Sequence, residues 1–211
     1  MKRWVLAKVL AGSIAALLLG ACSAGNARPQ LQQYQLAIPR IPLELRHADI
    51  PEIGDVSAAP PYEDTAVVYQ TSPTQLGIYH YHRWISSPTE LVRDYMEKLV
   101  GSEDDGQPTR PHKLILEARI DGFNELDEGD QTFGVVDIRF CLRRSHSKPK
   151  TTSCWRDRHL TVASDRSASA VVDAINRSFE ETMVELSNQL TSRLGGGLQQ
   201  PQRSKEALEQ E

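Results

Sequence analysis

Three cysteines and six histidines are the residues of this chain best suited to covalent or metal chemistry. Cys22 follows Leu19, Gly20 and Ala21, and an apolar residue, two small residues and then cysteine is the pattern that lipoprotein processing requires. The thiol of such a cysteine accepts a diacylglyceryl group. Ordinary cleavage that leaves a free thiol is the alternative. We therefore expect Cys22 to carry a lipid and to become the first residue of the mature protein.

The segment before Cys22 has the organisation of a secretory signal peptide. Basic residues precede a predominantly apolar run over residues 9–19, which is the order in which such a signal is built. The run is shorter than the roughly 20 apolar residues that cross a bilayer. We expect residues 1–21 to be removed and acyl chains to hold the protein in the cell envelope. By analogy with lipoprotein sorting in Gram-negative bacteria, Ser23 favours the outer membrane, facing the periplasm.

The other two cysteines, Cys141 and Cys154, lie on either side of a polar loop. An oxidising compartment favours their pairing as a disulfide. Together with His146 and His159 they could instead form a zinc site. The spacing is not that of a compact zinc finger, and oxidation removes the thiolates that zinc needs. We therefore expect a disulfide that closes the loop across two strands.

His80 and His82 form the second candidate for metal binding, because alternate residues of a strand can present two imidazoles on one face. A third ligand is not evident nearby in the sequence. The favoured interpretation is a packed aromatic cluster with Tyr79 and Trp84, and we expect no metal.

Motifs for catalysis are not apparent. The nucleophile pattern Gly-x-Ser-x-Gly does not occur after the signal peptide. The triple glycine at 195–197 follows a predicted helix instead of opening one, so it cannot present amides to a phosphate. The acidic clusters at 103–105 and 125–130 lack the ligand spacing of a calcium loop. We expect no enzymatic activity and no cofactor.

Composition limits the class of partner. The chain has 24 Lys and Arg against 28 Asp and Glu, and the predicted signal peptide removes only basic residues. The mature chain is therefore distinctly acidic, which makes it a poor candidate for nucleic-acid binding. Its length suits one domain with tails.

The elements that position these residues follow from hydrophobic periodicity. We expect a flexible tether over 22–33, a domain over 34–194 and a disordered tail over 195–211. Residues 50–64 and 124–130 are predicted as a loop and a turn. Alternation of apolar and polar residues predicts strands over 41–45, 66–71, 75–80, 113–121, 136–142 and 154–162. The last three are expected to pair antiparallel with their neighbours.

Two helices are predicted. Ser87, Pro88 and Glu90 form a capping signal, so a helix is expected from there to about Val100, with Gly101 ending it. A second helix over 168–194 has apolar residues at steps of three and four, which predicts one continuous buried stripe. This helix would cover the sheet, and its far end could contact a partner.

The strand before the first helix carries a recognisable motif. The motif reads Tyr79-His80-Tyr81-His82-Arg83-Trp84. Followed by Ser87-Pro88 and Leu91, it resembles the central motif of ABC-type transport auxiliary lipoproteins, the lipoprotein component of MCE-type intermembrane lipid transport systems. Tyr62, Val68-Tyr69 and Leu76 are similar to the preceding hairpin of that family, and the helix over 174–194 to its last helix. The chain departs at 32–34, where a tyrosine pair is usual, and in the added loop between the two cysteines.

The resemblance implies a two-layer α/β (α+β) domain, with a mixed, mostly antiparallel sheet packed against two helices. It also implies a non-enzymatic partner of an MCE-domain protein in the transport of phospholipids or other hydrophobic molecules. Tyr79 and Trp84 would be apolar anchors, and Arg83 could pair with a carboxylate. The alternative is that Tyr79, His82, Arg83 and Trp84 form a partner-binding patch.

A different function remains open from the residues alone. A structural envelope lipoprotein that assists outer-membrane protein assembly would share the anchor and the size. Adjacent genes for a permease, an ATPase and an MCE protein would favour transport. The sequence also leaves a homo-oligomer open.

Overall fold

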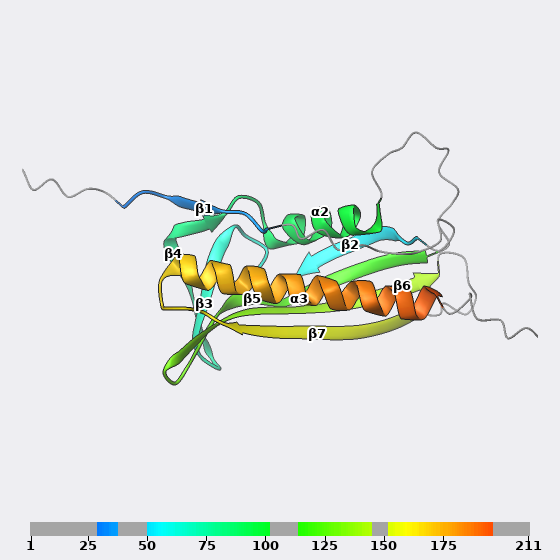
Figure 1. Cartoon of the computed structure of the whole chain (residues 1–211). Helices are drawn as coiled ribbons and strands as arrows, with labels where there is room; N and C mark the ends of the chain where they lie inside the picture. Colours follow the sequence, from blue (N-terminus) through cyan, green and yellow to red (C-terminus); the bar gives the residue numbers. More distant parts are fainter. Residues whose placement is uncertain (1–28, 38–49, 102–113, 145–151, 196–211) are drawn as a thin grey trace, which may run out of the picture. The chain divides into compact units, whose positions relative to one another are not determined.

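The computed structural model describes residues 29–37, 50–101, 114–144 and 152–195 (Figure 1). The chain divides into two units, residues 1–31 and 32–211, and the domain is the second of them. In the described part of the domain, a seven-stranded mixed sheet packs against two helices, so the expected α+β class is confirmed. The domain begins at Gln32, inside the stretch predicted as a tether.

The sheet combines antiparallel hairpins with parallel pairings. Its strand order is β1 (Gln32–Tyr34), β4 (Gln75–Trp84), β3 (Ala66–Ser72), β5 (Leu114–Glu128), β6 (Gln131–Arg144) and β7 (Thr152–Val162), and β2 (Glu52–Ala58) also pairs with β5. The β3–β4, β5–β6 and β6–β7 pairings are antiparallel, which confirms the predicted hairpin and the predicted three-stranded meander. The β1–β4, β2–β5 and β3–β5 pairings are parallel.

Two predictions of irregular structure are wrong, and both concern the long strand β5. The predicted loop over 50–64 contains β2, which pairs with the first half of β5. The predicted turn over 124–130 is mostly strand, because β5 continues to Glu128 and its second half pairs with both β3 and β6. Gly54 suits β2 because an added Cβ would lie 2.6 Å from the Ile115 side chain. The glycine and acids that suggested loops therefore belong to strands fixed by distant partners.

Helix α2 (Pro88–Val100) forms as its capping signal predicts. The Ser87 side chain accepts a hydrogen bond from the Glu90 amide, and the Glu90 carboxylate accepts one from the Ser87 amide. Gly101 ends the helix in the left-handed conformation, with φ at 69°, which glycine adopts without steric cost. Met96 and its apolar neighbours are buried on the sheet side.

Helix α3 (Ala168–Gly195) lies along the same face of the sheet, over β6 and β7 (Figure 1). Ile175, Phe179, Met183, Leu186 and Leu190 are fully buried, as the predicted stripe requires. The closest approach is at Gly134, where an added Cβ would collide with the backbone of Ala174 and Ile175. The Ser178 hydroxyl donates a hydrogen bond to the Gly134 carbonyl at 2.8 Å. The glycine thus allows the helix to pack directly on the strand.

Several predictions fall outside the described residues. These are the signal peptide, lipid attachment at Cys22, the strand over 41–45, the site of His146 and the tail after Gly195. Among the described residues, no helix is long and apolar enough to cross a membrane.

Candidate functional site

Trp84, the last residue of the motif, is an internal anchor of the domain. Its side chain is 1% exposed. The indole packs edge-on against Phe123, with ring centroids 5.1 Å apart, and against Tyr34 at 6.4 Å. Its Nε1 group is buried, and the described residues offer it no hydrogen-bond partner. The tryptophan therefore joins β1, β4 and β5 through apolar contact.

Tyr79 joins β4 to β5 through a buried carboxyl group. Its hydroxyl donates a hydrogen bond of 2.5 Å to Glu125, and its ring contacts Tyr69 at 5.3 Å. Glu125 is 4% exposed. Burial raises the pKa of Glu125, and the Tyr79 hydrogen bond opposes that rise by favouring the ionised form. Burial and the Glu125 hydrogen bond raise the pKa of Tyr79 well above its usual range, so it remains a donor.

His82 holds the short strand β1 against β4. The Tyr34 hydroxyl lies 2.8 Å from Nδ1 of His82, and the two rings are stacked. The His82 ring also meets the Tyr79 ring edge-on at 5.4 Å. Such a contact three residues apart needs an irregular strand, and the β3–β4 register does shift between Ile78 and Arg83. The bulge turns His82 and Tyr79 toward each other.

The motif therefore has one buried member, Trp84, three partly buried members and two exposed members. Tyr79, His82 and Trp84 form ring contacts within the domain. His80 and Tyr81 are exposed. Arg83 is partly exposed, and the expected carboxylate partner for it is not found among the described residues. His80 and His82 do not belong to any described cluster of three metal-ligating side chains.

The structure places a disulfide between Cys141 and Cys154, which lie directly opposite each other on β6 and β7. Cys154 is exposed on the face of β7 that points away from the helices. His159 projects from the other face, toward α3, where its Nδ1 lies 3.3 Å from Glu181. Alternation along β7 therefore separates His159 from the cysteines, and the zinc hypothesis loses that ligand.

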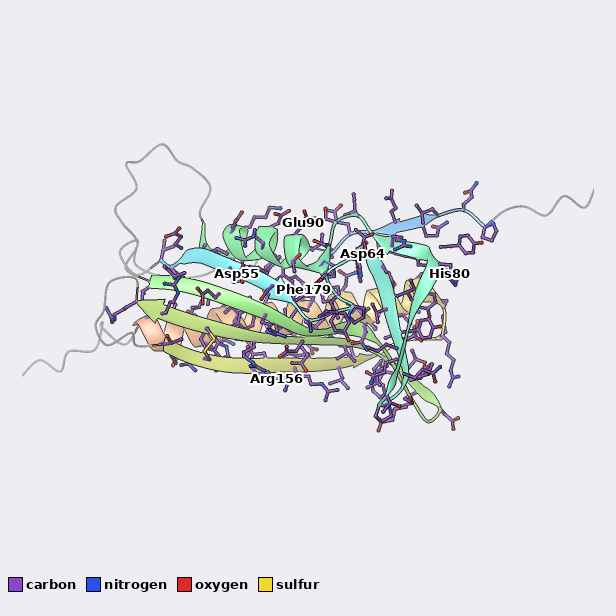
Figure 2. All side chains as sticks on the ribbon, turned by 180° about the vertical axis from the view of Figure 1, so that it is seen from behind. Asp55, Asp64, His80, Glu90, Arg156 and Phe179 are labelled. Carbon is purple, nitrogen blue, oxygen red and sulfur yellow. A yellow bond between two sulfur atoms is a disulfide. The ribbon has the colours of Figure 1, made fainter. Side chains whose placement is uncertain are left out.

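The sheet face that carries the disulfide is not covered by α2 or α3, and Figure 2 looks onto it. We call it the open face. One part of it carries five arginines, which we call the arginine rows: Arg119, Arg139, Arg143, Arg156 and Arg158. Glu117, Asp121 and Asp137 lie between them. Arg156 binds Asp137 through two hydrogen bonds of 2.6 Å. Sequence alternation placed these residues on one side of their strands but did not show that the side stays open.

The other part of the open face is apolar. Strand register aligns two rows across β4, β3, β5, β6 and β7, which we call the apolar rows. The first consists of Leu76, Gln70, Leu126, Phe133 and Val162, and the second of Ile78, Val68, Asn124, Val135 and Leu160. At the ends of these rows the exposed fractions are 47% for Leu76, 42% for Ile78 and 48% for Val162. The middle of the second row is buried, because the Tyr62 hydroxyl donates a hydrogen bond of 3.0 Å to Asn124 on this face. This surface could not be found from the sequence because its members come from five strands.

The concave features are shallow. One depression of about 490 Å³ lies between α3 and β7, beside His159, Arg177 and Val184. Another of about 180 Å³ lies at the far end of α3, beside Arg143, Arg193 and Leu194. Neither contains a motif residue. The extended surfaces of the sheet are therefore better candidates for a functional site than these depressions.

Two solved structures share the fold. A protein of Xanthomonas campestris, described as a member of the family DUF330, aligns with a TM-score of 0.64 and 15% sequence identity over 80% of this chain and 100% of its own. An uncharacterized protein aligns with a TM-score of 0.60 and 16% identity over 76% and 99%. No family model and no curated protein matches the sequence. At these identities the likeness extends to the fold alone.

Proposed function

We propose that this protein is a lipid-anchored lipoprotein of the outer membrane, facing the periplasm, and an auxiliary component of an ABC-type transport system. Its partner would be an MCE-domain protein, and the cargo phospholipids or other hydrophobic molecules. The observation that carries the proposal is the motif on β4 (Gln75–Trp84), which resembles that of the transport auxiliary lipoproteins. The lipoprotein pattern ending at Cys22 supports the anchor. The disulfide supports export, because such bonds persist in oxidising compartments.

The geometry of the motif favours a division of roles. Tyr79 and Trp84 are held inside the domain and shape β4. Tyr81 lies on the same strand and is 48% exposed. Ile85, the first residue after the strand, is 55% exposed. Exposed aromatic and apolar side chains on a rigid element are suited to be anchors of an interface. We assign the contact with the MCE-domain protein to Tyr81, Ile85 and the exposed His80.

Site-specific cross-linking in intact cells tests this assignment. A photoreactive amino acid at position 81 of the full-length chain is expected to cross-link to an MCE-domain protein, identified by mass spectrometry. The same group at Val184, which is 42% exposed on α3, is the matched control and should not give that product. Cross-links from position 81 to outer-membrane assembly proteins would contradict the proposal and favour the structural alternative.

A second measurement separates contact from folding. Ile85→Asp should lower the yield of the MCE-domain protein that co-purifies with the tagged lipoprotein, because a charge in an interface core is costly. Since Ile85 is exposed, the thermal midpoint should hardly change. Equal co-purification by the Ile85→Asp and Val184→Asp variants would contradict the assigned surface.

A further inference from the structure

Strand β7 forms a border of the sheet, and in Figure 1 it is the yellow strand with no other described strand beyond it. It pairs with β6 on one side only. It is eleven residues long, whereas proteins commonly keep edge strands short to prevent pairing with other chains. The unpaired side of β7 is therefore a candidate site for an added strand.

The β6–β7 register shows which backbone groups of β7 point away from the sheet. The Ala163 amide donates a hydrogen bond of 2.8 Å to the Thr132 carbonyl, and the pairing continues from there without a shift. Because the backbone groups of such a strand alternate between its two sides, every second residue directs its amide and carbonyl outward. These residues include Cys154, Arg156, Arg158 and Leu160.

One contact confirms this direction. Arg177 of α3 donates a hydrogen bond of 3.2 Å to the carbonyl of Val162, which lies two residues beyond Leu160. Arg177 thus covers the edge at the end of the strand. Between 154 and 160, the outward amides and carbonyls have no backbone partner among the described residues.

The depression of about 490 Å³ between α3 and β7 lies beside this edge. It is lined by His159 of β7 and by Val184 of α3, which is 42% exposed. An extended segment laid along β7 would direct every second side chain toward this depression. In complexes formed by strand addition, backbone hydrogen bonds give affinity and pockets for alternate side chains give specificity. The edge and the depression together supply both.

The charges on the two sides of the edge define the partner. On the open face, Arg156 and Arg158 both pair with Asp137, and their side chains are still 53% and 51% exposed. Two guanidinium groups on one carboxylate leave a positive charge, which favours acidic side chains in an added strand. On the α3 side the depression is acidic, because its lining includes one arginine, Arg177, and three glutamates: Glu180, Glu181 and Glu185.

We propose that the free edge of β7 binds an extended segment of a second protein, which adds a strand to the sheet. The side chains of this segment that face the arginines are acidic, and those that face the depression are apolar or basic. A second copy of β7 fits poorly. Antiparallel pairing about the middle of the strand would place Arg156 opposite Arg158 of the other copy, and like charges directly opposite are destabilising. The inference goes beyond the proposed function and does not depend on it.

Binding of a fluorescent peptide to the full-length protein in detergent tests the added strand. The probe alternates glutamate with valine over about nine residues, within the usual length of strands. The wild type is expected to bind it with a Kd in the micromolar range. In NMR exchange measurements, the peptide should protect the amide hydrogens of Arg156, Arg158 and Leu160. A peptide with lysine in place of glutamate should bind about tenfold more weakly or worse.

Leu160→Pro separates backbone pairing from charge. Proline removes only an outward amide at this position, which an edge strand tolerates, so the thermal midpoint should fall little while peptide binding is lost. Leu160→Ala keeps the amide and should bind like the wild type. Arg158→Glu should weaken binding about tenfold, whereas Arg93→Glu, the same change on α2, should not. Should Leu160→Pro fail to fold, Arg158→Glu and the amide protection still decide.

Several outcomes would overturn the proposal. These are a wild type that does not bind the peptide, equal binding by folded Leu160→Pro and Leu160→Ala, equal affinity for the glutamate and lysine peptides, or protection of amides outside β7 only. A wild-type dimer that the peptide does not disrupt and that Leu160→Pro abolishes would assign the edge to a second copy instead.

Discussion

Glu125 is the clearest titrating group inside the domain. It is 4% exposed, and one hydrogen bond from Tyr79 reaches its carboxyl group. Because burial raises its pKa above the ordinary value of 4.5, the folded state holds its proton more tightly than the unfolded state. Its contribution to stability is complete below the unfolded pKa and is lost as the pH rises through the folded pKa.

Glu125→Gln should remove this pH dependence. Glutamine keeps an acceptor for Tyr79 but carries no charge, so the variant should gain stability relative to the wild type as the pH rises above about 4.5. Urea unfolding of both proteins at a series of pH values measures the difference. Glu128→Gln, exposed on the same strand, is the control. A difference between Glu125→Gln and wild type that stays constant with pH would refute the role of the buried charge.

Trp84→Ala should destabilise the domain by about 3 to 5 kcal/mol, the usual cost of truncating a large buried aromatic side chain. The substitution removes the ring packing against Phe123 and Tyr34, which connects three strands. Chemical unfolding measures the change, and Tyr81→Ala, at an exposed site, should cost much less. An unchanged midpoint for Trp84→Ala together with lost transport would place the tryptophan in a partner interface.

At the scale of elements, the disulfide fixes the antiparallel pair β6–β7. Cys141 and Cys154 face each other in the register, and the bond restricts the unfolded chain around the intervening loop. Replacing both with serine should cost roughly 3 kcal/mol on the loop-entropy estimate. Urea unfolding measures the cost, and reduced wild type should resemble the double variant.

Mass spectrometry of non-reduced, chelator-treated protein should show the loss of two hydrogens. Two thiols that become reactive only after chelation would restore the zinc hypothesis.

The contact of α3 with β6 predicts a strong effect of a small substitution. Gly134→Ala adds a Cβ that would collide with the backbone of Ala174 and Ile175. The helix must then move away, at a cost of about 1 to 3 kcal/mol for overpacking. Thermal unfolding tests this, with Ala118→Gly on β5 as a control for backbone entropy at another buried site. Full stability of Gly134→Ala would mean that the helix does not rest on this glycine.

Local signals and distant pairings explain which elements the sequence predicted. Helix α2 and the β3–β4 hairpin were predictable because a capping box, Gly101 and a short turn lie within the elements themselves. Strand β2 was missed because its pairing with β5 is parallel and long-range. The end of β5 was missed because Asn124 and Glu125 are polar, and their partners Tyr62 and Tyr79 are far away in the chain.

The candidate site shows the same limit. The motif could be located from sequence, and the two cysteines could be paired because the sequence predicts an oxidising compartment. Which motif residues are buried could not, because the bulge between Ile78 and Arg83 breaks simple alternation. The apolar rows follow only from the register of five strands, each contributing one residue to a row.

At the scale of the whole molecule, the domain separates a covered face from an open one. The helices α2 and α3 bury one face of the sheet, and Tyr95 meets Phe179 between them at 5.2 Å. In the proposed function, the exposed end of β4 contacts the MCE-domain protein.

The anchor itself gives the last prediction. Leu19, Gly20 and Ala21 precede Cys22 in the pattern that lipoprotein processing requires, and only a thiol accepts the diacylglyceryl group. Cys22→Ser should therefore abolish incorporation of a palmitate analogue, which metabolic labelling followed by immunoprecipitation measures. Ser23→Ala, one position later, should label like the wild type and controls for expression. Equal labelling of Cys22→Ser and wild type would exclude Cys22 as the lipid site and remove the membrane anchor from the proposed function.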